Sequence, residues 1–132
     1  MRAAVVAPQD ERDTTVTRSD QNDINRFARL LNERIDTGHT LRMRRELLRL
    51  HDDAADELIL ADDDELVQHV VGDVFCYAPK SEVEARIQEQ KEKLEAEIAD
   101  LDAQLAAIVD EMQKLKSHLY AKFGNTINLE ES

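Results

Sequence analysis

The chain has 132 residues, of which 35% are charged and only 4% are aromatic, with no tryptophan. With three glycines and two prolines, this composition is typical of long helices and coiled coils and argues against a loop-rich globular fold. A net charge of −12 disfavours nonspecific binding to nucleic acid and docking on anionic membranes. Cys76 is the only cysteine, so no disulfide can form within the chain, and a reducing compartment is the simplest interpretation.

Residues 1–16 carry mixed charges and Pro8 without a helical period, and we expect a disordered N-terminal tail. The acids Asp10, Glu11 and Asp13 argue against a targeting peptide, and no apolar run reaches membrane-spanning length. We therefore expect a cytoplasmic protein without a membrane partner. The sequence leaves open whether it also works in the nucleus.

A first helix is predicted over residues 17–61. Thr17 and Asp20 have the spacing of a capping box at its start. An apolar stripe follows at helical spacing: Ile24, Phe27, Leu31, Ile35, Leu41, Leu48, Ala55 and Ile59. Gly38 weakens the middle of this helix, and a break into two helices there is the alternative. The acids of residues 62–65 oppose the dipole at the C-terminal end of the helix and should stop it.

A β-hairpin is predicted over residues 66–78, with Gly72 and Asp73 as a two-residue loop suited to a type II′ turn. That loop places Val71 opposite Val74 and Val70 opposite Phe75, and it makes both faces of the hairpin apolar. A two-stranded hairpin is marginal alone, and its edges are unpaired. We therefore expect hairpins of other chains to complete a larger sheet or barrel. The expected subunit interface is Val67, Val70, Val71, Val74, Phe75 and Tyr77.

A second helix is predicted over residues 81–122, opened by a capping box of Ser81 and Glu84 and ended near Gly124. Its stripe runs from Ile87 to Leu119, with Lys91 at one seam position as a device that sets register. Residues 123–132 are expected to form an acidic C-terminal tail. The fold class is therefore mainly α, a long antiparallel α-helical coiled coil with one β-hairpin between the helices.

The far ends of the two helices meet in this arrangement and form an apolar tip. A narrow two-helix seam should not bury both Leu30 and Leu31, nor the apolar residues beyond Gly124. The tip is then either a contact surface for other proteins or a simple closure of the coil with a frayed tail. The residues expected at the tip are Ile24, Phe27, Leu31, Leu119, Tyr120 and Phe123.

The sequence contains no convincing catalytic, metal or cofactor site. The contiguous acids of residues 62–65 lack the alternation of a Ca²⁺ loop, and His69 with Cys76 supplies only two ligands. There is no phosphate-binding glycine loop and no nucleophile beside a base. Arginines 42, 44, 45 and 49 form either an RNA-binding patch or, more simply, a solvated charged face. We predict that the protein is not an enzyme.

Three segments together resemble the β-type prefoldin subunits. The first is the stretch Asp20–Arg29. The second runs from Leu60 to Asp64 and resumes at Val71–Phe75. The third is Leu119–Gly124, continued by Ile127–Glu130. They occur in the same order as in that family and span most of the chain, although the segment between Leu30 and Arg49 departs from the family pattern.

The resemblance implies a co-chaperone subunit that works without ATP in a heterohexamer of two α-type and four β-type subunits. It further implies that the hairpins form a β-barrel and that the tips hold unfolded actin and tubulin for delivery to the cytosolic group II chaperonin. A coiled-coil scaffold and a nucleic-acid-binding helical arm are the alternative functions.

Overall fold

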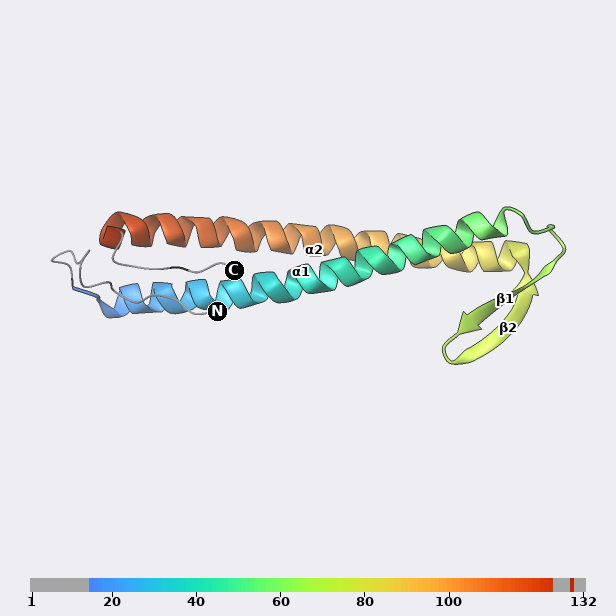
Figure 1. Ribbon diagram of the computed structural model, residues 1–132, viewed down its shortest axis with the longest axis horizontal. Coiled ribbons are helices and arrows are strands. Elements are labelled where there is room, and N and C mark those ends of the chain that lie inside the picture. Colours follow the sequence, from blue (N-terminus) through green and yellow to red (C-terminus); the bar gives the residue numbers. More distant parts are fainter. Residues whose placement is uncertain (1–14, 125–128, 130–132) are drawn as a thin grey trace. The chain divides into compact units, whose positions relative to one another are not determined.

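The computed structural model describes residues 15–124 and residue 129. Its elements are α1 (Arg18–Leu58), β1 (Leu66–Val71), β2 (Val74–Pro79) and α2 (Lys80–Phe123), as Figure 1 shows. Asp20 contacts Lys122 and Arg26 contacts Glu111, so residues further along α1 meet residues earlier in α2. The predicted pair of antiparallel helices with a hairpin between them is confirmed.

The chain divides into two compact units. The terminal unit contains α1 up to His39, α2 from Asp102, and Leu129; the hairpin unit spans Thr40–Leu101. Each unit has its own apolar cluster. Helix α1 is continuous through Gly38, so the alternative of two separate helices is wrong, although the boundary between the units falls just after this glycine.

Helix α1 begins with the predicted capping box. The backbone N–H of Asp20 donates to Oγ1 of Thr17 over 3.1 Å, and the backbone N–H of Thr17 donates to Oδ2 of Asp20 over 2.9 Å. The helix ends at Leu58, before the predicted end at residue 61, because the next backbone N–H groups bond three residues back as the chain tightens into turns. As a result Leu58 is buried, whereas Ile59, which the sequence assigned to the apolar stripe, is exposed.

Lys80 connects the start of α2 to the turns that follow α1. Its Nζ donates to the carbonyl of Ala61 over 2.9 Å and lies within 3.8 Å of Asp63 and 3.7 Å of Glu84. Helix α2 begins at Lys80, one position before the prediction, with Pro79 preceding it. Ser81 lies inside the first turn, and among the described residues no hydrogen bond joins it to Glu84, so the second capping box is wrong.

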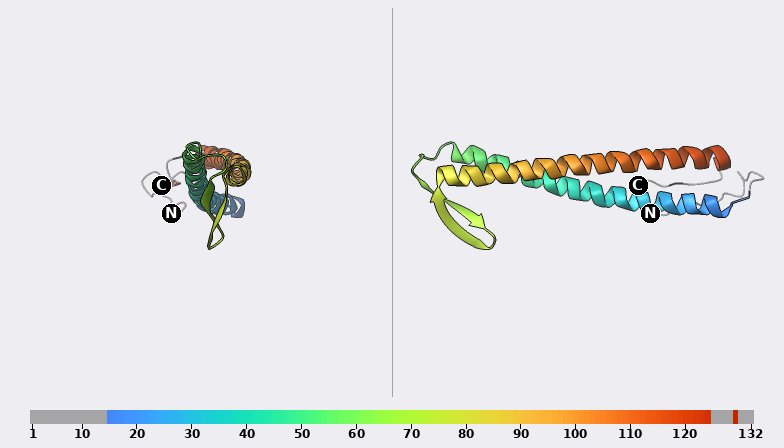
Figure 2. Two further views of the ribbon diagram at one scale, coloured as in Figure 1. Left: turned by 90° about the vertical axis from the view of Figure 1, so that its right-hand side faces the viewer. Right: turned by 180° about the vertical axis from the view of Figure 1, so that it is seen from behind.

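The hairpin has the predicted register, with Val71 opposite Val74, Val70 opposite Phe75, and His69 opposite Cys76. Gly72 has a φ of 61°, the conformation that primed two-residue turns require at their first central position. The hairpin forms a two-stranded sheet between α1 and α2 in the chain, and Figure 2 shows it from two further sides.

Candidate functional site

The outer face of the hairpin is apolar and open. Because side chains alternate along paired strands, this face carries Leu66, Val70, Phe75 and Tyr77 around Gln68. Val70 is 57% exposed, Phe75 67% and Tyr77 68%. Large apolar side chains this exposed and this close together form an open apolar patch on the described part of the chain.

The inner face of the hairpin packs on the helices of the same unit. Ala78 is buried with Leu58 and Val83, and Val67 and Ile87 pack against them. His69 is half-buried on this face, where its Nε2 accepts a hydrogen bond of 2.9 Å from the Nη1 of Arg86. Its Nδ1 is buried and has no hydrogen-bond partner in the described part of the chain. Toward the turn the packing ends, because Val71 and Val74 are exposed.

A cavity of about 720 Å³ lies beside this inner face. β1 and Gly72 line one side of it, and the helix segments 50–58 and 83–90 contribute the remaining walls. The predicted interface residues on β1, Val67, Val70 and Val71, all border this space. Apolar residues of the hairpin therefore border two open spaces. One is the solvent at the outer face, and the other is this cavity.

The apolar cluster of the terminal unit contains the residues predicted for the tip. Ile24, Phe27, Leu31, Leu119 and Phe123 are buried in it, and Tyr120 packs against its edge. Phe27, Leu31 and Leu119 are fully buried. The structure brings the predicted tip residues together, but it places most of them inside the unit rather than on its surface.

The expectation that Leu30 and Leu31 cannot both be buried is wrong. Leu30 is 3% exposed and Leu31 is fully buried. Leu129 lies beyond the end of α2 and is also buried in this cluster. The cluster therefore contains a side chain from outside the two helices. Phe123, assigned by sequence to the tail, is the last residue of α2 and is buried as well, whereas Ile127 lies outside the described residues.

Asp20 connects the two helices at this cluster. Its buried carboxylate completes the capping box of α1 and also pairs with Nζ of Lys122 in the last turn of α2. The hydrogen bond from Lys122 is the main reason that the pKa of Asp20 is lowered from 3.8 to about 2, and the backbone N–H of Thr17 adds to the effect. The sequence showed the capping box but gave no signal for the partner on the other helix.

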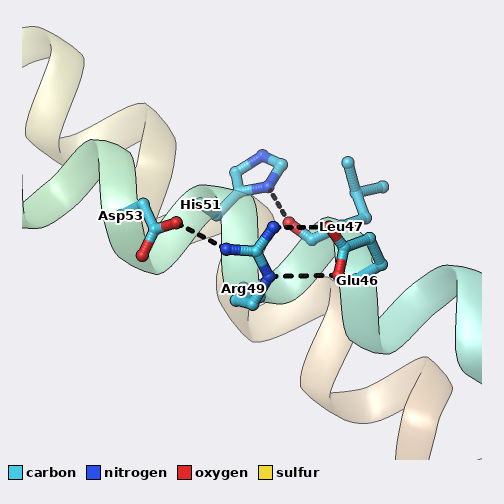
Figure 3. Close-up of polar contacts among 5 residues, drawn as sticks. All are labelled: Glu46, Leu47, Arg49, His51 and Asp53. Carbon is cyan, nitrogen blue, oxygen red and sulfur yellow. Dashed lines mark hydrogen bonds and ion pairs between the residues drawn. The ribbon is translucent and has the colours of Figure 1, made fainter.

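Two arginines of the predicted basic patch, Arg44 and Arg49, pair with acidic side chains. Arg49 donates to Asp53 over 2.9 Å and to both carboxylate oxygens of Glu46, as Figure 3 shows. Glu46 correspondingly raises the pKa of Arg49. Arg44 donates to Glu97 on α2 over 2.8 Å. These pairs favour a solvated charged face over an RNA-binding patch, because paired guanidinium groups add little attraction for phosphate.

No other kind of site emerges from the described residues. Within residues 15–124 and at residue 129, no three His, Cys, Asp or Glu side chains are grouped so that they could hold a metal ion. None of the described helices has both the length and the apolar character needed to cross a membrane. The described residues offer one exposed apolar surface, the outer face of the hairpin, and one buried apolar cluster, in the terminal unit.

This architecture matches known proteins. The family model described as "Prefoldin subunit" matches residues 21–126. Prefoldin subunit 4 of Saccharomyces cerevisiae is 39% identical over 124 residues, which cover 93% of this chain and 96% of that protein. Prefoldin subunit 4 of Homo sapiens is 36% identical over 129 residues, with 97% and 96% covered. The crystal structure of the prefoldin beta subunit from Thermococcus strain KS-1 shares the fold, with a TM-score of 0.73 at 18% identity, over 81% of this chain and 94% of that one.

The fold and the sequence relationships thus define a β-type coiled-coil subunit of a chaperone, not an enzyme. The chain belongs to the prefoldin subunit family, and its resemblance within that family is to subunit 4.

Proposed function

We propose that this chain assembles with two α-type and three further β-type prefoldin subunits into a heterohexamer. The observation that carries the proposal is the outer hairpin face, where Val70, Phe75 and Tyr77 are exposed although they are large and apolar. Burying the exposed part of such side chains stabilises an assembly, and about 1.5–3 kcal/mol is the gain for a side chain that passes from full exposure to full burial. Sister hairpins that pair with the open strand edges would complete a β-barrel, which leaves no edge unpaired.

The cavity beside the inner face supports the same proposal. Val67 and Val71 border it, and a neighbouring chain that fills this space would cover their apolar side chains. The six interface residues expected from the sequence, Val67, Val70, Val71, Val74, Phe75 and Tyr77, therefore form the proposed subunit interface.

The proposed activity is the ATP-independent holding of unfolded polypeptides such as actin and tubulin, which are then delivered to the group II chaperonin in the cytoplasm. The terminal cluster is the proposed client-binding end. Phe27, Leu31 and Leu119 would support its shape from within, and Tyr120 would reach the client from the edge. Several weakly binding ends on one hexamer would add up to firm retention of a client.

A reconstitution experiment tests this function. The complete set of six subunits should suppress the aggregation of denatured actin without ATP and should release it to the chaperonin. A set that lacks only this chain should do neither. Equal suppression by both sets would contradict the proposal. The scaffold alternative predicts assembly without any suppression, so the same experiment separates the two functions.

A further inference from the structure

Strand β1 carries two neighbouring polar residues, Gln68 and His69, with apolar residues on either side of them. Because side chains alternate along a strand, the two lie on opposite faces of the hairpin. On the inner face, Nε2 of His69 accepts a hydrogen bond of 2.9 Å from Nη1 of Arg86. On the outer face, Gln68 is exposed, and no hydrogen bond joins its side-chain amide to another residue that the structure describes. The polar residue of the inner face thus has a partner on α2, whereas that of the outer face has none within the described chain.

Large exposed apolar side chains surround Gln68. Tyr77 lies directly opposite it on β2, and Phe75 lies opposite Val70. Leu66 and Val70 are its neighbours on the same face of β1, two residues away on either side. All four of these side chains are more than half exposed. The apolar patch of the outer face therefore has one side-chain amide at its centre.

Covering the outer face would remove water from the amide of Gln68. This group has two N–H donors and one carbonyl acceptor. Leaving it buried and unpaired costs more free energy than a typical hydrogen bond contributes to stability. A purely apolar partner surface would impose this cost. A partner that places a hydrogen-bonding group opposite Gln68 would avoid it.

We propose that Gln68 is a specificity-determining residue of the subunit interface, which selects a sister hairpin with an amide, hydroxyl or carboxylate side chain opposite it. This inference rests on the proposed heterohexamer and states how the partner hairpin is chosen. A single polar residue in an apolar interface selects partner and register in this way, at some cost in stability.

A second copy of this chain is the partner that Gln68 rejects. Two copies could cover their apolar outer faces against each other, so apolar contact alone does not prevent this pairing. In a two-fold pair, the two Gln68 amides meet only where the axis passes between them. Every other register buries both amides without a partner from the other copy. Gln68 therefore disfavours pairing of the chain with itself.

Removing the amide should change correct and incorrect assemblies in opposite directions. Gln68→Met keeps an unbranched side chain of similar length but loses the hydrogen-bonding groups. The correct hexamer should become less stable, because the polar group of the sister hairpin then lacks its partner. Hexamers with two or more copies of this chain should become more stable, because no amide is buried unpaired. A general gain in apolar contact would instead favour both kinds of hexamer.

The test mixes the six full-length subunits at equal concentrations and counts the copies of this chain in each hexamer by native mass spectrometry. The wild type is compared with Gln68→Met and with Gln68→Leu, a second apolar replacement. Gln88→Met is the matched control, because Gln88 is an exposed glutamine of α2 in the same unit and bonds to Glu92 on its own helix. Circular dichroism verifies that each variant is folded.

We expect the ratio of multiple-copy to single-copy hexamers to rise at least about fivefold in Gln68→Met and Gln68→Leu. Gln88→Met should keep the ratio of the wild type. An unchanged ratio in both Gln68 variants, or an equal rise in Gln88→Met, would overturn the specificity role and leave the proposed heterohexamer intact. Absence of any hexamer that contains the wild-type chain would overturn both.

Discussion

Nζ of Lys91 lies 2.7 Å from Oδ1 of Asp52, so that a cation on α2 meets an anion on α1 at a seam position where an apolar residue is usual. The hydrogen bond from Lys91 to Asp52 is the main reason that the pKa of Lys91 is raised. A shift of the helices by one turn would separate the two groups and leave a lysine against apolar neighbours. The pair therefore favours one register of the hairpin unit.

Reversing this charge should destabilise the chain. In Lys91→Glu a carboxylate replaces the ammonium group beside Asp52, with Asp56 and Glu95 also close enough to act on it. We expect a lower midpoint of thermal unfolding, followed by circular dichroism. Lys93→Glu is the matched control, because exposed Lys93 contacts Glu89 at 3.6 Å on its own helix. Equal losses in the two variants would contradict a special role for Lys91.

The capping box at the start of α1 should make a separate contribution. Thr17→Ala removes the side-chain oxygen that accepts from the backbone N–H of Asp20. Loss of such a cap costs about 1 kcal/mol in the free energy of unfolding. Urea unfolding measures this difference, and Thr15→Ala, an exposed threonine before the helix, should have almost no effect. A loss as large in Thr15→Ala would show that the cap is not its cause.

The carboxylate of Asp20 should also make stability depend on pH. Its pKa is about 2 in the folded chain and 3.8 when unperturbed. A group with a lowered pKa stabilises the fold above its unperturbed pKa, and the stabilisation is lost as the pH falls through the folded pKa. Between pH values of about 5 and 2, the unfolding free energy of Asp20→Asn should therefore fall less steeply than that of the wild type.

The comparison for this pH series is Asp100→Asn, which removes an exposed carboxylate of α2 in the hairpin unit. Its slope should follow the wild type. If Asp20→Asn and the wild type lose stability in parallel, then the pairing with Lys122 does not contribute to folding as described.

The terminal cluster should be the most sensitive part of its unit to truncation. Phe27 is fully buried, so Phe27→Ala leaves a cavity and should cost about 3–5 kcal/mol. Ile35→Ala lies on the same helix in the same unit, but Ile35 is exposed, and we expect a loss of less than about 1 kcal/mol. Chemical denaturation of both variants checks the prediction, and similar losses would contradict the assignment of the core.

The sequence predicted the order of elements because each element has a local signal. Helical spacing of apolar residues indicated α1 and α2, and Gly72 between two valine-rich segments indicated the hairpin and its register. The predictions from sequence were wrong at the helix ends, where contacts between residues far apart in the chain contribute to the structure. Both helix boundaries differ from the prediction, and Lys80 contacts Ala61 in the turns between them, a contact that no local pattern contains.

The candidate sites were predictable to different degrees. Strand alternation alone predicted that both faces of the hairpin are apolar, but it did not indicate that one of them packs on the helices of the same chain. The terminal cluster was predicted with the right residues, but the burial of Leu30 and the position of Leu129 depend on a segment without periodicity. The partners of Asp20 and Lys91 on the opposite helix could not be predicted either. A single sequence does not show which residues far apart in the chain are in contact.

The most direct measurement of the central claim is native mass spectrometry of the six subunits expressed together with Val70→Asp in this chain. Val70 is largely exposed in the isolated chain, so the variant should fold normally, but an aspartate buried between hairpins would lack a partner. Val109→Asp, the same change on an exposed part of α2, should assemble like the wild type. The account predicts a heterohexamer with Val109→Asp and none containing Val70→Asp. A hexamer of normal mass and stability that includes Val70→Asp would contradict it.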